Sequence, residues 1–185
     1  MKIRRGFVSN SSSSSFILTF RGDSEEDCFK AMKEHSALFN LRQYDHICNV
    51  NDVIGMIKSC IMSPPDIDKI KGDPYCWDEN CYMFDLSFIV EKKEEELNEA
   101  KKTYEEEKDD KFVAKYYSEV IRDLEKDLEA YKKAKERGHN KAIHIECGDN
   151  HGHVSGTNAS TAMDYALGDE RITKDDLCII GSKKH

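Results

Sequence analysis

The chain has 185 residues, of which 35% are charged, and its formal net charge is −8 at pH 7. This length favours one domain with an elaboration over two independent domains. The acidic balance argues against nucleic-acid and anionic-membrane binding, which depend on lysine and arginine, and no stretch approaches the roughly 20 apolar residues of a transmembrane helix.

The first elements that we predict are a strand and two helices. Residues 16–20 (Phe-Ile-Leu-Thr-Phe) are apolar strand formers and end at an Arg-Gly-Asp turn. Ser24 followed by three acidic residues indicates a capped helix start, because a hydroxyl and carboxylates satisfy free amides there. This helix is expected to reach about residue 39. A second helix is predicted from a cap at Asn51 to Pro64-Pro65, with residues 44–50 extended between the two.

Residues 82–90 show the clearest alternation in the sequence. Every second residue is apolar, while Asp85 and Ser87 point to the other side, and a period of two is typical of a strand with one buried face. The chain is therefore predicted to return to the sheet here. The apolar positions are Tyr82, Phe84, Leu86, Phe88 and Val90.

The composition changes between residues 91 and 137, where more than half of the residues are charged and neither glycine nor proline occurs. Apolar residues step by three and four, which predicts a helical seam of the coiled-coil type. A break near residues 108–110 and the Gly138 C-cap favour an antiparallel hairpin of two helices, with one long helix as the alternative. Phe112, Tyr116 and Val120 lie beside the seam and widen its apolar surface. The seam itself consists of Ala114, Tyr117, Ile121, Leu124, Leu128 and Tyr131.

The last part of the chain returns to short elements. Residues 142–147 alternate and predict a strand, a polar loop follows to residue 158, and Asn158 or Ser160 is expected to cap a short helix. Residues 177–180 predict a final strand. The fold class is therefore α+β, with a small mixed sheet of about four strands, short helices and a helical hairpin inserted at about 91–137. Residues 1–90 and 138–185 together form the body, and residues 1–15 form a serine-rich motif.

A cluster of possible metal ligands lies in and after the strand at 142–147. Imidazole, thiolate and carboxylate groups are the ligands that zinc prefers. The spacing matches no common zinc motif, so a polar hairpin loop without metal is the other interpretation. The candidate ligands are His144, Cys147, Asp149, His151 and His153.

Five consecutive serines, Ser11 to Ser15, stand between apolar residues and behind a small basic cluster. Buried hydroxyls each need a partner, so we expect a hydroxyl-rich turn before the strand at 16–20 and not a core strand through the serines. The adjacent arginines would suit an anion or a phosphorylated serine.

The whole string reads Arg-x-Gly-Phe-Val-Ser-Asn-Ser-Ser-Ser-Ser-Ser-Phe. It resembles an N-terminal motif that recurs on otherwise dissimilar, mostly uncharacterised proteins of bacteria and their phages. The resemblance covers under a tenth of the chain and implies a bacterial or phage origin, but no activity. Its positions here are Arg4, Gly6, Phe7, Ser9, Asn10, Ser11, Ser12, Ser13, Ser14, Ser15 and Phe16.

Two hypotheses for the function follow. The first is a non-enzymatic accessory protein that binds a protein partner, or itself, through the charged hairpin. The alternative is a metal-dependent enzyme of the zinc type, such as a hydrolase, at the histidine loop. Seven cysteines and the absence of an apolar signal region after the basic start favour the cytoplasm, that of the host if the protein is phage-encoded.

Overall fold

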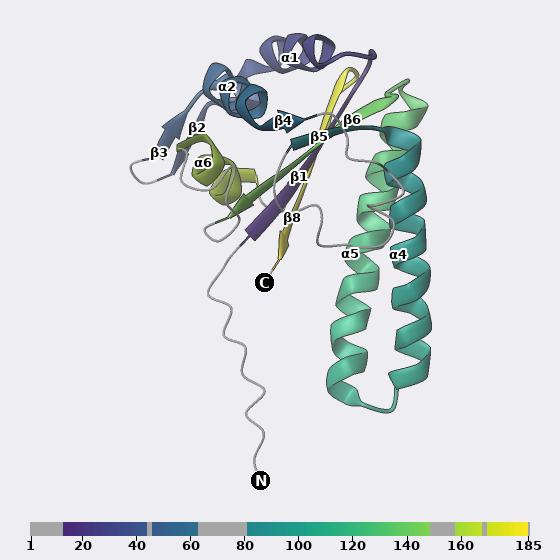
Figure 1. Ribbon diagram of the computed structural model, residues 1–185. Coiled ribbons are helices and arrows are strands. Elements are labelled where there is room, and N and C mark those ends of the chain that lie inside the picture. Colours follow the sequence, from purple (N-terminus) through teal and green to yellow (C-terminus); the bar gives the residue numbers. More distant parts are fainter. Residues whose placement is uncertain (1–12, 44–45, 63–80, 149–157, 168–169, 185) are drawn as a thin grey trace.

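The computed structural model describes residues 13–43, 46–62, 81–148, 158–167 and 170–184. Their centre is a six-stranded sheet in the order β4-β5-β6-β1-β8-β7, in which only the β4–β5 pair is parallel (Figure 1). The α+β class is confirmed, and the sheet is wider than the four strands expected. Its strands are β1 (Ser13–Phe20), β4 (Ile61–Met62), β5 (Cys81–Asp85), β6 (Lys141–Gly148), β7 (Arg171–Thr173) and β8 (Leu177–Lys184).

One face of the sheet is covered by short helices. They bury the even-numbered side chains of β1, such as Phe16 and Leu18, together with Ile143, Ile145 and Ile179 of the neighbouring strands. The elements on this side are α1 (Glu25–Glu34), a 3₁₀ helix (Ser36–Phe39), the small β2–β3 ribbon (Leu41–Gln43 and His46–Cys48), α2 (Val50–Cys60) and α6 (Asn158–Leu167).

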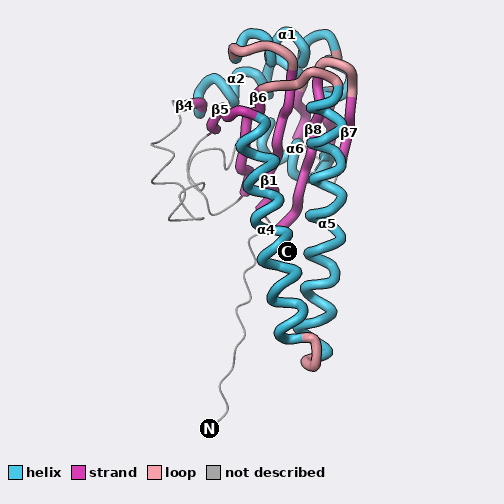
Figure 2. The backbone as a smooth tube through the Cα atoms, turned by 90° about the vertical axis from the view of Figure 1, so that its right-hand side faces the viewer, coloured by secondary structure: helices cyan, strands magenta, loops and turns pink. Residues whose placement is uncertain are grey.

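The other face is covered by a hairpin of two long helices, α4 (Leu86–Glu107) and α5 (Lys111–Glu136). The odd-numbered Ile17 of β1 lies here with Ala142, Cys178 and Ile180, in a second buried cluster that includes residues of both helices. Figure 2 shows the resulting three layers, with the hairpin in front of the sheet. The hairpin prediction is confirmed, including its break at residues 108–110.

The hairpin is inserted between two strands that are direct neighbours. Tyr82 of β5 is paired with His144 of β6, and Asp85 is paired with Lys141. The chain therefore leaves the sheet after β5, runs out along α4, returns along α5 and re-enters beside the strand that it left. In Figure 1 the far half of the hairpin extends beyond the sheet.

The predicted strand at 82–90 is only half correct. The strand ends at Asp85 and α4 begins at Leu86, so Phe88 and Val90 are helical. The apolar residues Leu86, Ile89 and Val90 are also spaced by three and four, which suits a helix equally well. Leu86 and Val90 fit both a period of two and a helical period, so the alternation does not distinguish a strand from a helix in this segment.

Other boundaries differ from the prediction as well. The first helix, expected to reach about residue 39, ends at Glu34, and a separate 3₁₀ helix covers Ser36–Phe39. β1 begins at Ser13, so three of the five serines lie in a strand and not in a turn; Ser11 and Ser12 lie outside the described residues. The strand extends this far because Ser13 is paired on both sides, with Gly148 of β6 and Lys184 of β8. The second helix begins at Val50, two residues before the expected start, because Asn49 caps it by accepting a hydrogen bond from the Asn51 amide.

Candidate protein-binding surface

The two ends of the hairpin are fixed to one end of the sheet by backbone hydrogen bonds. The Leu86 amide, at the start of α4, donates to the Asn140 carbonyl, and the Asn140 amide donates to the carbonyl of Phe20. Lys141 and Asp85 form an ion pair of 2.8 Å across the strands that enter and leave the hairpin. The base of the hairpin is thus held in a defined position.

The end of α5 has a Schellman cap. Gly138 adopts a φ of +84°, its amide donates to the Lys135 carbonyl, and the amide of His139 donates to the Ala134 carbonyl. Arg21, in the turn after β1, adds a hydrogen bond of 2.7 Å from its Nε to the Arg137 carbonyl. The predicted glycine stop is confirmed, and a long-range contact strengthens it.

His139, the residue after Gly138, connects the end of the hairpin to β1 and to the turn between β7 and β8. Its Nε2 lies 3.0 Å from the Asp175 carbonyl, which only accepts hydrogen bonds, so Nε2 carries the proton. Nδ1 then accepts from the Thr19 hydroxyl at 2.8 Å. Burial lowers the pKa of His139, and the nearby Arg21 adds to this effect. The base of the hairpin therefore contains a neutral imidazole with a hydrogen bond at each ring nitrogen.

A partly buried ion pair holds α5 against the edge of the sheet. Asp127 Oδ1 accepts a hydrogen bond of 2.8 Å from Nε of Arg171, on β7, and Nη2 of the same guanidinium lies 2.7 Å from this oxygen. Burial raises the pKa of Asp127, and the Arg171 guanidinium opposes this rise. The contact fixes the side of α5 that faces the sheet.

The predicted seam lies between the helices, and its burial changes along the hairpin. Leu128 and Tyr131, near the base, are 5% and 1% exposed and belong to the core cluster under the sheet. The outer seam residues Ala114, Tyr117, Ile121 and Leu124 are only half-buried. On α4 the seam continues through Val90, Leu97, Ala100 and Tyr104. Ion pairs of 2.8 Å join the helices at Lys101–Glu125 and Glu94–Lys132.

A second apolar stripe on α5 continues past the end of the sheet. At 3.6 residues per turn, Phe112, Tyr116 and Val120 lie on the same side of α5 as the residues that contact the sheet at the base. Both groups together fall within an arc of roughly 100° around the helix axis. Those basal residues are buried: Asp127, Ala130, Tyr131 and Ala134. Beyond the sheet the same side has no cover from the described part of the chain, so Phe112 is 82% exposed and Tyr116 57% exposed. We call Phe112, Tyr116 and Val120 the distal patch.

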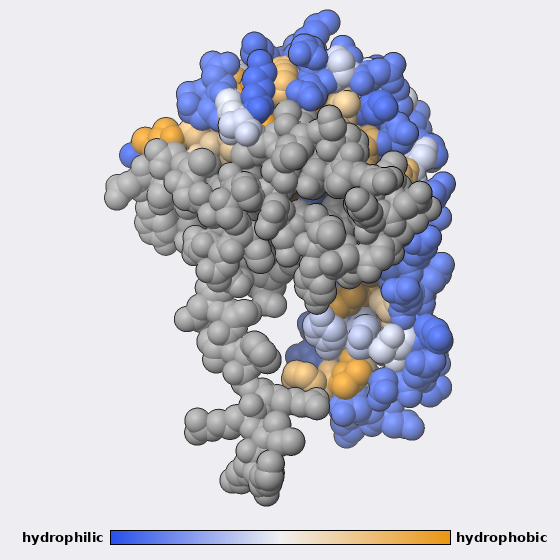
Figure 3. All heavy atoms as spheres, in the orientation of Figure 1, coloured by the Kyte–Doolittle hydropathy of each residue, from blue (hydrophilic) through white to orange (hydrophobic). Residues whose placement is uncertain are grey.

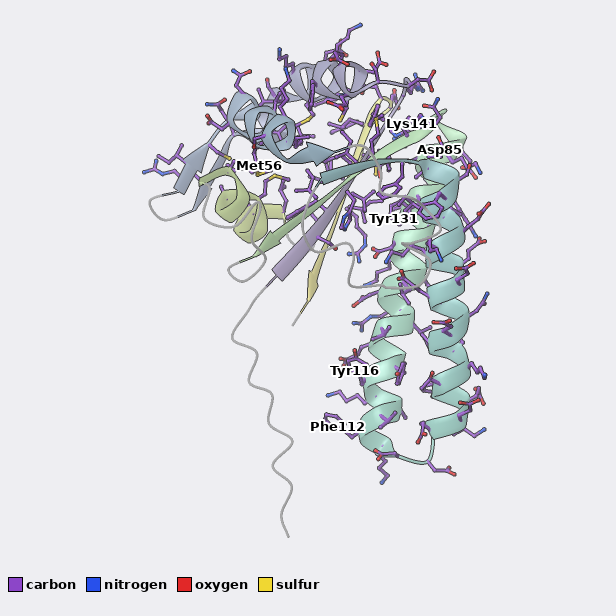
Figure 4. The ribbon with its side chains drawn as sticks, in the orientation of Figure 1. Met56, Asp85, Phe112, Tyr116, Tyr131 and Lys141 are labelled. Atoms are coloured by element: carbon purple, nitrogen blue, oxygen red, sulfur yellow. The ribbon has the colours of Figure 1, made fainter. Side chains whose placement is uncertain are left out.

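The figures show the setting of the distal patch. In Figure 4, Phe112 and Tyr116 project from the side of α5 that is turned away from α4. Figure 3 shows apolar surface in this part of the hairpin, surrounded by hydrophilic surface. Tyr116 makes an edge-to-face contact with Tyr117, with 5.2 Å between the ring centres. This contact joins the distal patch to the outer end of the seam.

Two of the surface hollows among the described residues lie on helical surface. One, of about 400 Å³, follows the groove between the hairpin helices and is lined by Leu97, Leu128 and charged side chains such as Glu125 and Lys132. The other, of about 450 Å³, lies where α1 meets α2, around Phe29 and Lys58. Both are open and mostly lined by long charged side chains.

The structure places only part of the predicted metal cluster. His144 is buried on β6, and Cys147 lies on the same strand. Asp149, His151 and His153 lie outside the described residues, so the metal hypothesis stays a prediction. Within the described ranges, no group of three or more histidine, cysteine, aspartate or glutamate side chains is arranged to hold a metal ion.

The N-terminal motif is also only partly described. Arg4, Gly6, Phe7, Ser9, Asn10, Ser11 and Ser12 lie outside the described residues. Ser13, Ser14 and Ser15 are in β1, and Phe16 is fully buried in the core on the α1–α2 side. The motif therefore ends inside the central strand of the sheet.

Comparisons of the chain with protein-family models, curated proteins and solved structures gave no match. None of the helices in the described ranges has the length and apolar character needed to cross a membrane. The far half of the hairpin, which extends beyond the sheet, is therefore the strongest candidate for a functional surface.

Proposed function

We propose that the protein is a non-enzymatic binding protein whose hairpin is the binding arm. The observation that carries this proposal is the exposure of Phe112 and Tyr116, one turn apart, on a helix face that is buried nearer the base. Exposed aromatic residues that lie next to one another are typical of protein interfaces, where they supply most of the binding energy.

The way the hairpin is held supports the same proposal. Its base is fixed by the Asn140 backbone, the Asp85–Lys141 pair and the Asp127–Arg171 pair. A rigid arm presents its far end in one direction, which lowers the entropy lost on binding. The N-terminal motif supports a bacterial or phage cytoplasm as the setting of this accessory role.

Photo-crosslinking in cells tests the proposal. The crosslinking residue p-benzoylphenylalanine replaces Phe112, and in a matched control it replaces Ile47, the other strongly exposed apolar residue of the described structure, at 61%. We expect a discrete covalent adduct from position 112 and none from position 47, with the bound polypeptide identified by mass spectrometry. Equal labelling at both positions, or no adduct at 112, would contradict the proposal.

A further inference from the structure

We propose that the polypeptide on the distal patch is a second copy of this chain, with the two α5 helices antiparallel about a two-fold axis that passes beside Tyr116 at the level of residue 117. This inference rests on the proposed function and names its partner. Such an interface is isologous, because each copy contributes the same surface.

The charges beside the distal patch carry the argument. Lys115 and Glu119 lie one turn apart on the same side of the distal patch, and both are exposed. An antiparallel copy centred near residue 117 places Lys115 opposite Glu119. The symmetry produces this contact twice. A parallel copy would place lysine against lysine.

These charges are available for a partner. Within the described ranges, Lys115 and Glu119 take part in no ion pair of 4 Å or less, so neither has to give up a contact to pair with a second copy.

The apolar side chains fit the same arrangement. With the axis near residue 117, the two Tyr116 rings lie close to it, and each Phe112 covers the other helix about one turn further out. Antiparallel pairing also carries the two sheets to opposite ends of the paired hairpins, so the bodies do not compete for the same space. A partner that was uniformly basic or uniformly acidic would match only half of this surface.

A charge-swap experiment followed by sedimentation velocity tests this inference. One variant carries Lys115→Glu, and the other carries Glu119→Lys. Wild-type protein is expected to approach twice the single-chain mass of 21.3 kDa as its concentration rises. Each variant alone should associate about fivefold more weakly, because two exposed contacts become repulsive. An equal mixture of the two should regain wild-type association, because every contact is again between opposite charges.

The outcomes separate the two proposals. A wild-type mass of 21.3 kDa at every concentration, or a mixture that associates no better than its components, would overturn the self-association. If position 112 still formed an adduct with a different protein, the binding function would stand without it. Circular dichroism of each variant checks that the hairpin stays helical, which we expect because both positions are exposed.

Discussion

At the scale of single residues, the neutral imidazole of His139 makes the base of the hairpin sensitive to pH. The ring lies between the Thr19 hydroxyl and the Asp175 carbonyl; among charged groups, Arg21 lowers its pKa and Asp176 raises it. Burial holds its pKa below the ordinary value of about 6.5. As the pH falls below that value, the unfolded chain binds a proton that the folded chain does not bind.

The protein should therefore lose stability between about pH 7 and pH 5.5, and His139→Gln should make this loss smaller. The prediction is checked by the free energy of unfolding in urea at both pH values, for the wild type and the variant. The variant will be less stable at pH 7, so the informative quantity is the change with pH. An equal change in both proteins would show that His139 is not the group responsible.

Polar contacts between residues far apart in the chain could not be predicted from the sequence. Thr19 and His139 are 120 positions apart, and Asp127 and Arg171 are 44 apart. Nothing in the local pattern distinguishes these polar residues from others on the surface. Their roles depend on the packing of α5 against the sheet, which local periodicity does not determine.

At the scale of elements, the Schellman cap of α5 gives a test with a built-in control. Gly138→Ala should lower the free energy of unfolding by about 1 kcal/mol, because alanine is strained at a φ of +84°. The nearest atom to an added Cβ is Arg21 Nε at 3.7 Å, so the cost is conformational and not steric.

Gly55 in α2 is the matched control. It is exposed and helical, and an added Cβ would meet nothing within 4 Å. Gly55→Ala should therefore raise the free energy of unfolding by about 0.5 to 1 kcal/mol. Thermal or urea unfolding of both variants decides the matter. If both variants changed the free energy of unfolding in the same direction, the positive φ of residue 138 would not be what requires glycine there.

The elements that could be predicted have strong local signals. The hairpin and the helix after Ser24 are of this kind; the latter has a capping box in which Ser24 and Asp27 bond to each other's backbone amides. The strand at 82–90 failed beyond Asp85 because its apolar residues fit two periods. β1 could not be extended back to Ser13 from the sequence, because the pairing of the serines comes from β6 and β8, which are distant in the chain.

At the scale of the whole molecule, the hairpin divides into a buried base and an exposed far half. Its base belongs to the core, with Leu128 and Tyr131 buried under the sheet. Its far half extends beyond the sheet in Figure 1 and carries the distal patch. The sequence indicated the seam and the neighbouring Phe112 and Tyr116. It did not indicate that the sheet covers one stretch of α5 and leaves the next exposed.

The most direct test of self-association through the distal patch is the mass of the purified protein in solution. Sedimentation velocity over a range of concentrations compares the wild type with Phe112→Ser/Tyr116→Ser and with Ile47→Ser, which removes an exposed apolar residue elsewhere. We predict that the wild type and Ile47→Ser approach twice 21.3 kDa, while the double variant stays at 21.3 kDa. A wild type that stays at the single-chain mass, or a double variant that associates as the wild type does, would contradict the account.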